Sequence, residues 1–142
     1  MINTILKAGE NFCIHQIRLP YEVSDTINKT RTLIAFIDID TNNGEKHRVY
    51  IASEPGFVQR VSKLFLEEDE SDEETLIDMA LETVNLIVGS AKVLAQETNE
   101  TPFTIGTPVY DKQDTFNHDF DEAKVIKVEN DTMILAIKVI NG

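Results

Sequence analysis

The sequence predicts a single α+β domain in which two helices pack on a mostly antiparallel β-sheet. Apolar and polar residues alternate in the first third, recur at helical spacing in the middle, and alternate again near the end. Strands followed by helices and then by strands favour helices gathered on an antiparallel sheet. The length of 142 residues suits one domain, spanning 1–142.

The N-terminal segment is expected to hold the first strand. Met1–Glu10 is a poor candidate for a helix, and Phe12–Leu19 is an apolar run that predicts a strand ended by Pro20. Polar Tyr21–Thr30 is predicted to be a loop. Cys13, the one cysteine, excludes an internal disulfide, and on a strand it is expected to be a buried thiol rather than a nucleophile.

A β-hairpin is predicted next. Arg31–Asp40 alternates, with its apolar residues on one face, and Lys46–Ala52 is the return strand. Between them, Asn42-Asn43-Gly44 is typical of a tight turn. This turn also explains Asp38 and Asp40, because the glycine and the twelfth position do not fit a calcium-binding loop.

Two helices follow the hairpin. Ser53 is a plausible N-cap and Pro55 suits a first turn, while the apolar residues Val58, Val61, Leu64 and Phe65 recur at helical spacing. An acidic run, 67–74, then connects to a long helix of about 72–96, whose apolar stripe predicts one buried face. That stripe comprises Ile77, Ala80, Leu81, Val84, Val88, Ala91 and Ala95.

The C-terminal part is predicted to return to β structure. Phe103–Tyr110 suits a strand and polar Asp111–Asp121 a loop, and then Val125–Glu129 and Met133–Ile140 form a closing hairpin around Asn130-Asp131. No repeat or low-complexity linker interrupts this order.

The charge balance excludes several partners. The formal net charge is −12, so the chain repels phosphate backbones and anionic membrane surfaces. No apolar stretch reaches the length of a signal peptide or membrane span, which predicts a cytoplasmic protein. The three histidines are far apart in sequence, and no glycine-rich phosphate loop is present, so neither a metal site nor nucleotide binding is predicted.

The long helix carries a polar face opposite its apolar stripe. At 100° per residue this face contains Asp78, Glu82, Asn85, Gly89, Lys92 and Gln96. A carboxylate and a carboxamide thus stand one turn apart, and the plain interpretation is a solvated helix surface. Gly89 favours a functional role over this plain interpretation, because a mid-helix glycine is costly and often permits close approach by another part of the domain or by a partner.

An apolar flank lies beside the polar face. Met79, Leu86 and Val93 are spaced seven apart. We favour internal packing for them; the alternative is an apolar rim on which another protein docks.

These residues resemble the CheC/CheX/FliY family of chemotaxis phosphatases. The family pattern has Asp or Ser, three residues, Glu, two residues, Asn, then twenty-two residues and Pro; Asp78, Glu82, Asn85 and Pro108 keep every spacing. Gly89 fits as well. The likeness covers roughly Arg31–Tyr110, and the single Glu-x-x-Asn pair makes it nearest to single-site CheX.

The resemblance implies a hydrolase that removes phosphate from the aspartyl-phosphate of a CheY-type response regulator in chemotaxis, a two-component signalling system. Glu82 would contact the regulator's active-site lysine, and Asn85 would orient the attacking water. Further contacts to the regulator would come from Asp78, Leu86, Gly89 and Lys92. The chain would hold no cofactor of its own, since the regulator supplies Mg²⁺, and a homodimer through sheet edges is also implied.

Two other hypotheses remain open. The chain could be a non-enzymatic adaptor of the same fold that binds CheY or a flagellar switch protein, as the absence of an N-terminal helix would favour. It could also be a scaffold in which Glu82 and Asn85 no longer act.

Overall fold

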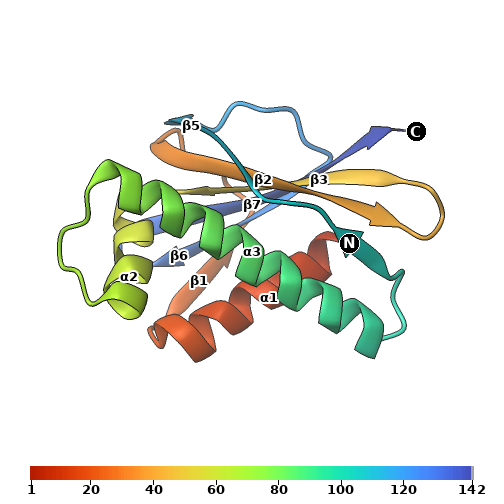
Figure 1. The fold of residues 1–142 in the computed structure, drawn as a ribbon, viewed down its shortest axis with the longest axis horizontal. Helices are drawn as coiled ribbons and strands as arrows, with labels where there is room; N and C mark the ends of the chain where they lie inside the picture. The colour runs from red at the N-terminus through yellow and green to blue at the C-terminus, as the bar shows by residue number, and fades with distance from the viewer. Residues whose placement is uncertain (142) are drawn as a thin grey trace.

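A seven-stranded sheet with helices on one face forms the body of the protein (Figure 1). The computed structural model describes residues 1–141. All strand pairs are antiparallel and follow the order β1-β6-β7-β3-β2, with β4 and β5 both paired to the outer side of β2. The predicted α+β class is confirmed.

The elements have the following bounds. The strands are β1 (Tyr21–Ser24), β2 (Arg31–Thr41), β3 (Lys46–Ser53), β4 (Phe103–Ile105), β5 (Val109–Thr115), β6 (Glu122–Val128) and β7 (Asp131–Asn141). The helices are α1 (Ile2–Phe12), α2 (Pro55–Leu66) and α3 (Glu73–Glu97), with a π-helical turn, η1 (Cys13–Ile17), directly after α1. Both predicted hairpins, β2–β3 and β6–β7, and both predicted helices are present.

The N-terminal prediction was wrong. Residues predicted to lack a helix form α1, and the predicted strand 12–19 is the end of α1 together with η1. Ile2, Ile5 and Phe12 face the core at helical spacing, and this burial outweighs a helix start without a side-chain cap. Gly9 lets α1 lie close to the sheet, because a Cβ there would stand 2.9 Å from Ile126 Cδ1.

Two predicted loops contain strands. Tyr21–Ser24 pairs with β6, and β5, which begins at Val109 in the predicted strand 103–110 and continues into the predicted loop 111–121, pairs with β2. Both sequences are mostly polar. Each lies at an outer position of the sheet with most of its residues exposed or half-buried. Strands of this kind bury few side chains, so they lack the apolar alternation on which the prediction rested.

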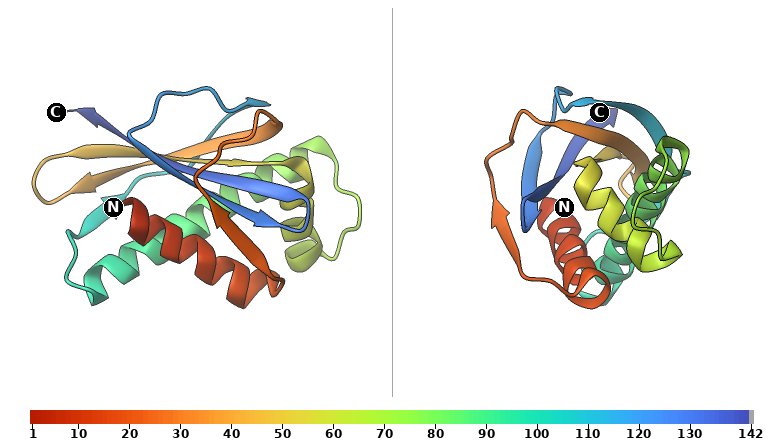
Figure 2. Two further views of the ribbon diagram at one scale, coloured as in Figure 1. Left: turned by 180° about the vertical axis from the view of Figure 1, so that it is seen from behind. Right: turned by 90° about the vertical axis from the view of Figure 1, so that its left-hand side faces the viewer.

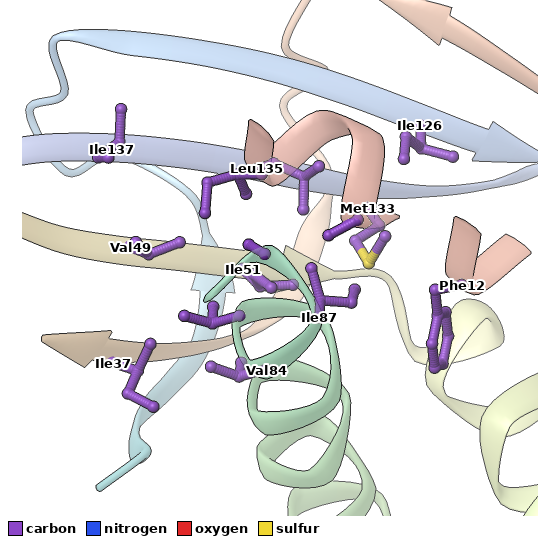
Figure 3. Close-up of a cluster of buried hydrophobic side chains, with 14 of the residues drawn as sticks. Phe12, Ile37, Val49, Ile51, Val84, Ile87, Ile126, Met133, Leu135 and Ile137 are labelled. Carbon is purple, nitrogen blue, oxygen red and sulfur yellow. The ribbon is translucent and has the colours of Figure 1, made fainter. Parts of the chain in front are cut away.

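The main core lies between α1, α2, α3 and the sheet. In Figure 3, Val84 and Ile87 of α3 point toward Ile37, Val49 and Ile51 of the sheet. All five side chains are at most 1% exposed. This packing fixes the rotation of α3 about its own axis, and so decides which of its residues face outward.

The opposite face of the sheet carries a smaller core under loops. Tyr50 stacks on His118 at 4.7 Å between ring centroids, and Phe116 packs edge-on against Tyr50. Figure 2 shows the loop between β5 and β6 on the side away from the helices. His118 also bonds Asp111 at 2.7 Å, which ties this loop to β5.

α2 is tied to the β6–β7 turn by an ion-pair network. Its N-cap is Glu54 rather than the predicted Ser53, which still pairs with β7 as part of β3. Arg60 donates to Asp131 at 3.0 Å and to Glu129 at 3.0 Å. A Cβ at Gly56 would stand 2.3 Å from Asp131 Oδ1, so a larger residue there would displace this carboxylate from its place beside Arg60.

We therefore predict that Gly56→Ala destabilises the protein by about 1–3 kcal/mol, as overpacking does elsewhere. Urea unfolding followed by circular dichroism measures this free energy. An alanine normally favours a helix over glycine. A stability equal to or above that of the wild type would therefore show that Asp131 moves aside freely.

Candidate functional site

α3 presents its polar face on a helix with a defined start. The N-cap Asp72 accepts a hydrogen bond from the Thr75 backbone N–H at 2.8 Å. Hydrogen bonding from Thr75, first by its side chain and then by its backbone N–H, lowers the pKa of Asp72, which favours the charged form beside the positive end of the helix dipole. The helix then runs unbroken through Glu97, so the spacing of its outward residues is that of an ideal helix.

The predicted site residues lie on this outward face. Asp78, Glu82 and Asn85 are exposed, and Gly89 and Lys92 are half-buried. Glu82 and Asn85 are separated by about 4.5 Å along the helix axis and about 60° around it. Within residues 1–141, neither makes a side-chain hydrogen bond or ion pair. Their polar groups are therefore free to meet a partner or solvent.

Gly89 has open space above it. A Cβ added there would have no neighbouring heavy atom within 4 Å. Of the two explanations for this glycine, close approach by another part of the domain is therefore wrong for the described residues. Close approach by a partner stays a prediction.

The apolar flank is only partly internal. Met79 packs against the core, but Leu86 is 37% exposed and Val93 51% exposed. The favoured internal packing was therefore wrong for Leu86 and Val93. The structure instead has the alternative arrangement, an exposed apolar rim beside the polar face.

A depression lies between α3, the end of α2 and η1. We call it the flank groove: it has a volume of about 270 Å³ and is lined by Gln16, Phe65, Met79, Glu82 and Leu86. Phe65 shares the helical spacing of the buried Val58 and Val61 in the sequence, whereas it is 41% exposed. The signal available was the run Leu64-Phe65-Leu66, since three consecutive apolar residues cannot share one helix face.

No cluster of three or more His, Cys, Asp or Glu suited to a metal occurs among residues 1–141. His47 pairs with Glu45 and His118 with Asp111. Cys13 is fully buried, and this burial raises the pKa of its thiol to about 12, with a smaller contribution from the nearby Glu10. The thiol is therefore protonated at neutral pH and poorly suited to nucleophilic attack.

No helix within residues 1–141 combines the length and the apolar character that a transmembrane helix needs.

The sequence of the chain matches one known protein family. The family model described as "Chemotaxis phosphatase CheX" matches residues 34–128, which is more than half of the chain. The chain belongs to the CheX family. The matched region includes α2, α3 and the outward face with Glu82 and Asn85. The family assignment made from the sequence is thereby confirmed.

Solved structures share the CheX fold over nearly the whole chain. The chemotaxis protein CheX from Vibrio vulnificus has a TM-score of 0.74 at 19% identity, covering 97% of each chain. A CheC-like superfamily protein from Shewanella sp. PV-4 has a TM-score of 0.75 at 20% identity, covering 99% of this chain and 97% of the other. No curated protein sequence matches this chain.

The CheX–CheY–BeF3–Mg²⁺ complex from Borrelia burgdorferi includes a third similar structure. Its matching chain has a TM-score of 0.67 at 14% identity and covers 96% of this chain and 97% of the other. At these identities the likeness establishes the fold, and the roles of Glu82 and Asn85 stay predictions.

We predict that Cys13 does not react with Ellman's reagent in the native protein at pH 8 and reacts fully in denaturant. The raised pKa favours the protonated thiol, so its contribution to stability is complete below pH 9 and is lost as the pH rises from 9 toward 12. Native-state labelling at a rate comparable to that of a free thiol would contradict the burial of Cys13.

Proposed function

We propose that this protein is a phosphatase that removes the phosphoryl group from the aspartyl-phosphate of a CheY-type response regulator. One observation carries the proposal. α3 is anchored by its buried face and turns Glu82 and Asn85 outward, without partners among the described residues. Membership of the CheX family supports the same conclusion.

Asn85 is proposed to position the attacking water. Its amide donates through nitrogen and accepts through oxygen, so one side chain can contact both a phosphoryl oxygen and a water. It is uncharged, and so it does not repel the phosphoryl dianion as a carboxylate would. Phosphoryl transfer depends mainly on positioning and electrostatics, so one oriented amide is a sufficient contribution from this chain.

Glu82 is proposed to fix the register of docking. It lies one turn before Asn85 and is displaced around the helix, so it meets a different part of the regulator. A cationic group there, such as the active-site lysine, would pair with this carboxylate. Asp78, Leu86, Gly89 and Lys92 would contact the surrounding regulator surface.

The regulator is proposed to bring the metal. The relative from Borrelia burgdorferi forms a complex with CheY, BeF3 and Mg²⁺. The described residues here offer no metal-binding cluster. We propose that this chain likewise binds a CheY-type regulator, and we expect the Mg²⁺ ion to belong to that regulator. We expect the encounter to occur in the cytoplasm.

The adaptor hypothesis has lost the observation that favoured it. It rested on a missing N-terminal helix, and the structure has α1 in that place. Binding without hydrolysis remains an outcome that the assay below would detect. The homodimer stays a prediction: the outer side of β1 is not paired within residues 1–141 and is a candidate edge.

We predict that Asn85→Ala lowers the dephosphorylation rate by about 100-fold or more while the fold is kept, because the water is no longer oriented. The assay follows loss of phosphorylated regulator after acetyl phosphate is removed. Gln96→Ala is the control, since it deletes an exposed amide from the same helix eleven residues later. The proposed phosphatase activity would be refuted if the wild-type protein accelerated dephosphorylation of no CheY-type regulator of the same genome.

Gly89→Ala is predicted to separate stability from activity. It should raise the free energy of unfolding by about 0.5–1 kcal/mol, because alanine favours the helix and the added Cβ meets nothing. It should lower kcat/KM by about tenfold, because the Cβ occupies the space that the regulator would enter. A more stable variant of undiminished activity would show that the regulator does not approach α3 at this point.

A further inference from the structure

Exposed apolar side chains gather where η1, α2 and α3 meet. Phe65 of α2 and Leu86 of α3 both line the flank groove and are each more than a third exposed. Large apolar groups gathered at one place on a surface usually mark a contact with another protein. Figure 1 shows the end of α2 beside the first half of α3, and the α2–α3 connection beyond it.

The flank groove opens directly beside the proposed catalytic residues. Glu82 lines it, and Leu86, one turn further along the same helix, lines it too. Leu86 and Gln16 also line a second depression of about 270 Å³ that continues between α1 and α3. A protein that docks on Glu82 and Asn85 of α3 therefore also covers the apolar trough formed by these two depressions.

η1 provides the wall of this trough opposite α3. The π-helical turn is closed by a hydrogen bond from the Arg18 N–H to the Cys13 carbonyl at 2.7 Å, and Arg18 then takes the left-handed conformation. The turn keeps Cys13 and Ile17 buried while Gln16 stays exposed at the edge of both depressions. π-helical insertions are frequent at functional sites.

The charge around the groove selects one kind of occupant. Phe65 is followed by the acidic run 67–74, in which Asp69 is paired with Lys63 and most other carboxylates are exposed without a cation. Glu82 adds a carboxylate on the opposite wall. An apolar side chain with a basic neighbour suits the groove, because the apolar group fills it and the cation faces Glu82 in its wall.

We propose that the flank groove binds an apolar side chain of the response regulator that has a lysine or arginine beside it, and that Phe65 is thereby a specificity residue. This inference rests on the proposed function, because it assigns the groove to the same partner. Phe65 and Leu86 act in recognition of the regulator and take no part in the chemical step.

The test measures kcat and KM for regulator dephosphorylation with single variants. Phe65→Ala and Leu86→Ala are each expected to raise KM about tenfold and to change kcat less than twofold. Leu64→Ala and Val139→Ala are the controls: these residues are as exposed as Phe65 and Leu86 respectively but do not line the groove. In both variants, direct binding to regulator treated with beryllofluoride and Mg²⁺ should weaken by the same factor. Binding by the wild-type protein should also weaken at high salt.

The outcomes separate this inference from the proposed function. Wild-type hydrolysis with KM unchanged in Phe65→Ala and Leu86→Ala would overturn the inference alone. So would a wild-type homodimer that Phe65→Asp dissociates without a change in KM, since the groove would then hold a second copy of the chain. No hydrolysis and no binding by the wild type would overturn both proposals.

Discussion

The burial of one stripe of α3 against the sheet determines everything that the outward face can do. Val84, Ile87 and Val88 are almost completely excluded from water. Each such side chain contributes about 1.5–3 kcal/mol on burial, so rotating the helix by even one residue is strongly opposed. The positions of Glu82 and Asn85 therefore follow from apolar packing rather than from any contact that they make themselves. A site held in this way needs no internal hydrogen bonds, so the polar groups of Glu82 and Asn85 stay available to a partner.

Three helical glycines differ in what lies close to them. Gly9 and Gly56 make room for contacts inside the domain, with the sheet and with the Asp131 carboxylate. Gly89 makes room for nothing within the described residues. A glycine in the interior of a helix is about 1 kcal/mol less favourable than an alanine. At Gly89 no contact within the described residues compensates for this loss of stability. Close approach by a partner to the outward face stays the prediction for this residue, and it agrees with the empty space above it.

The elements with strong local patterns could be predicted from the sequence, and those defined by distant contacts could not. Both hairpins and α3 have their own periodicity, and the outward placement of Glu82 and Asn85 followed from it. α1 begins without a side-chain cap and owes its place to packing against α3, β6 and β7. The exposure of Phe65 could not be predicted, because helical spacing identifies the apolar face of a helix but does not show which part of that face is covered. The flank groove joins residues of η1, α2 and α3 that are far apart in sequence, so only the fold brings it into view.

The distribution of charge fits an enzyme that acts on an anionic group bound to another protein. The chain carries a net charge of −12, which by itself would oppose approach to a phosphoryl dianion. The residue proposed to act closest to that group, Asn85, is neutral, and the half-buried Lys92 lies two turns further along the same face. The carboxylates are displaced to Glu82 and to the acidic run beyond Phe65, where they can attract basic groups around the regulator's active site. The acidic surface thus favours a partner with a basic rim, while the group proposed to act on the phosphoryl oxygens carries no charge of its own.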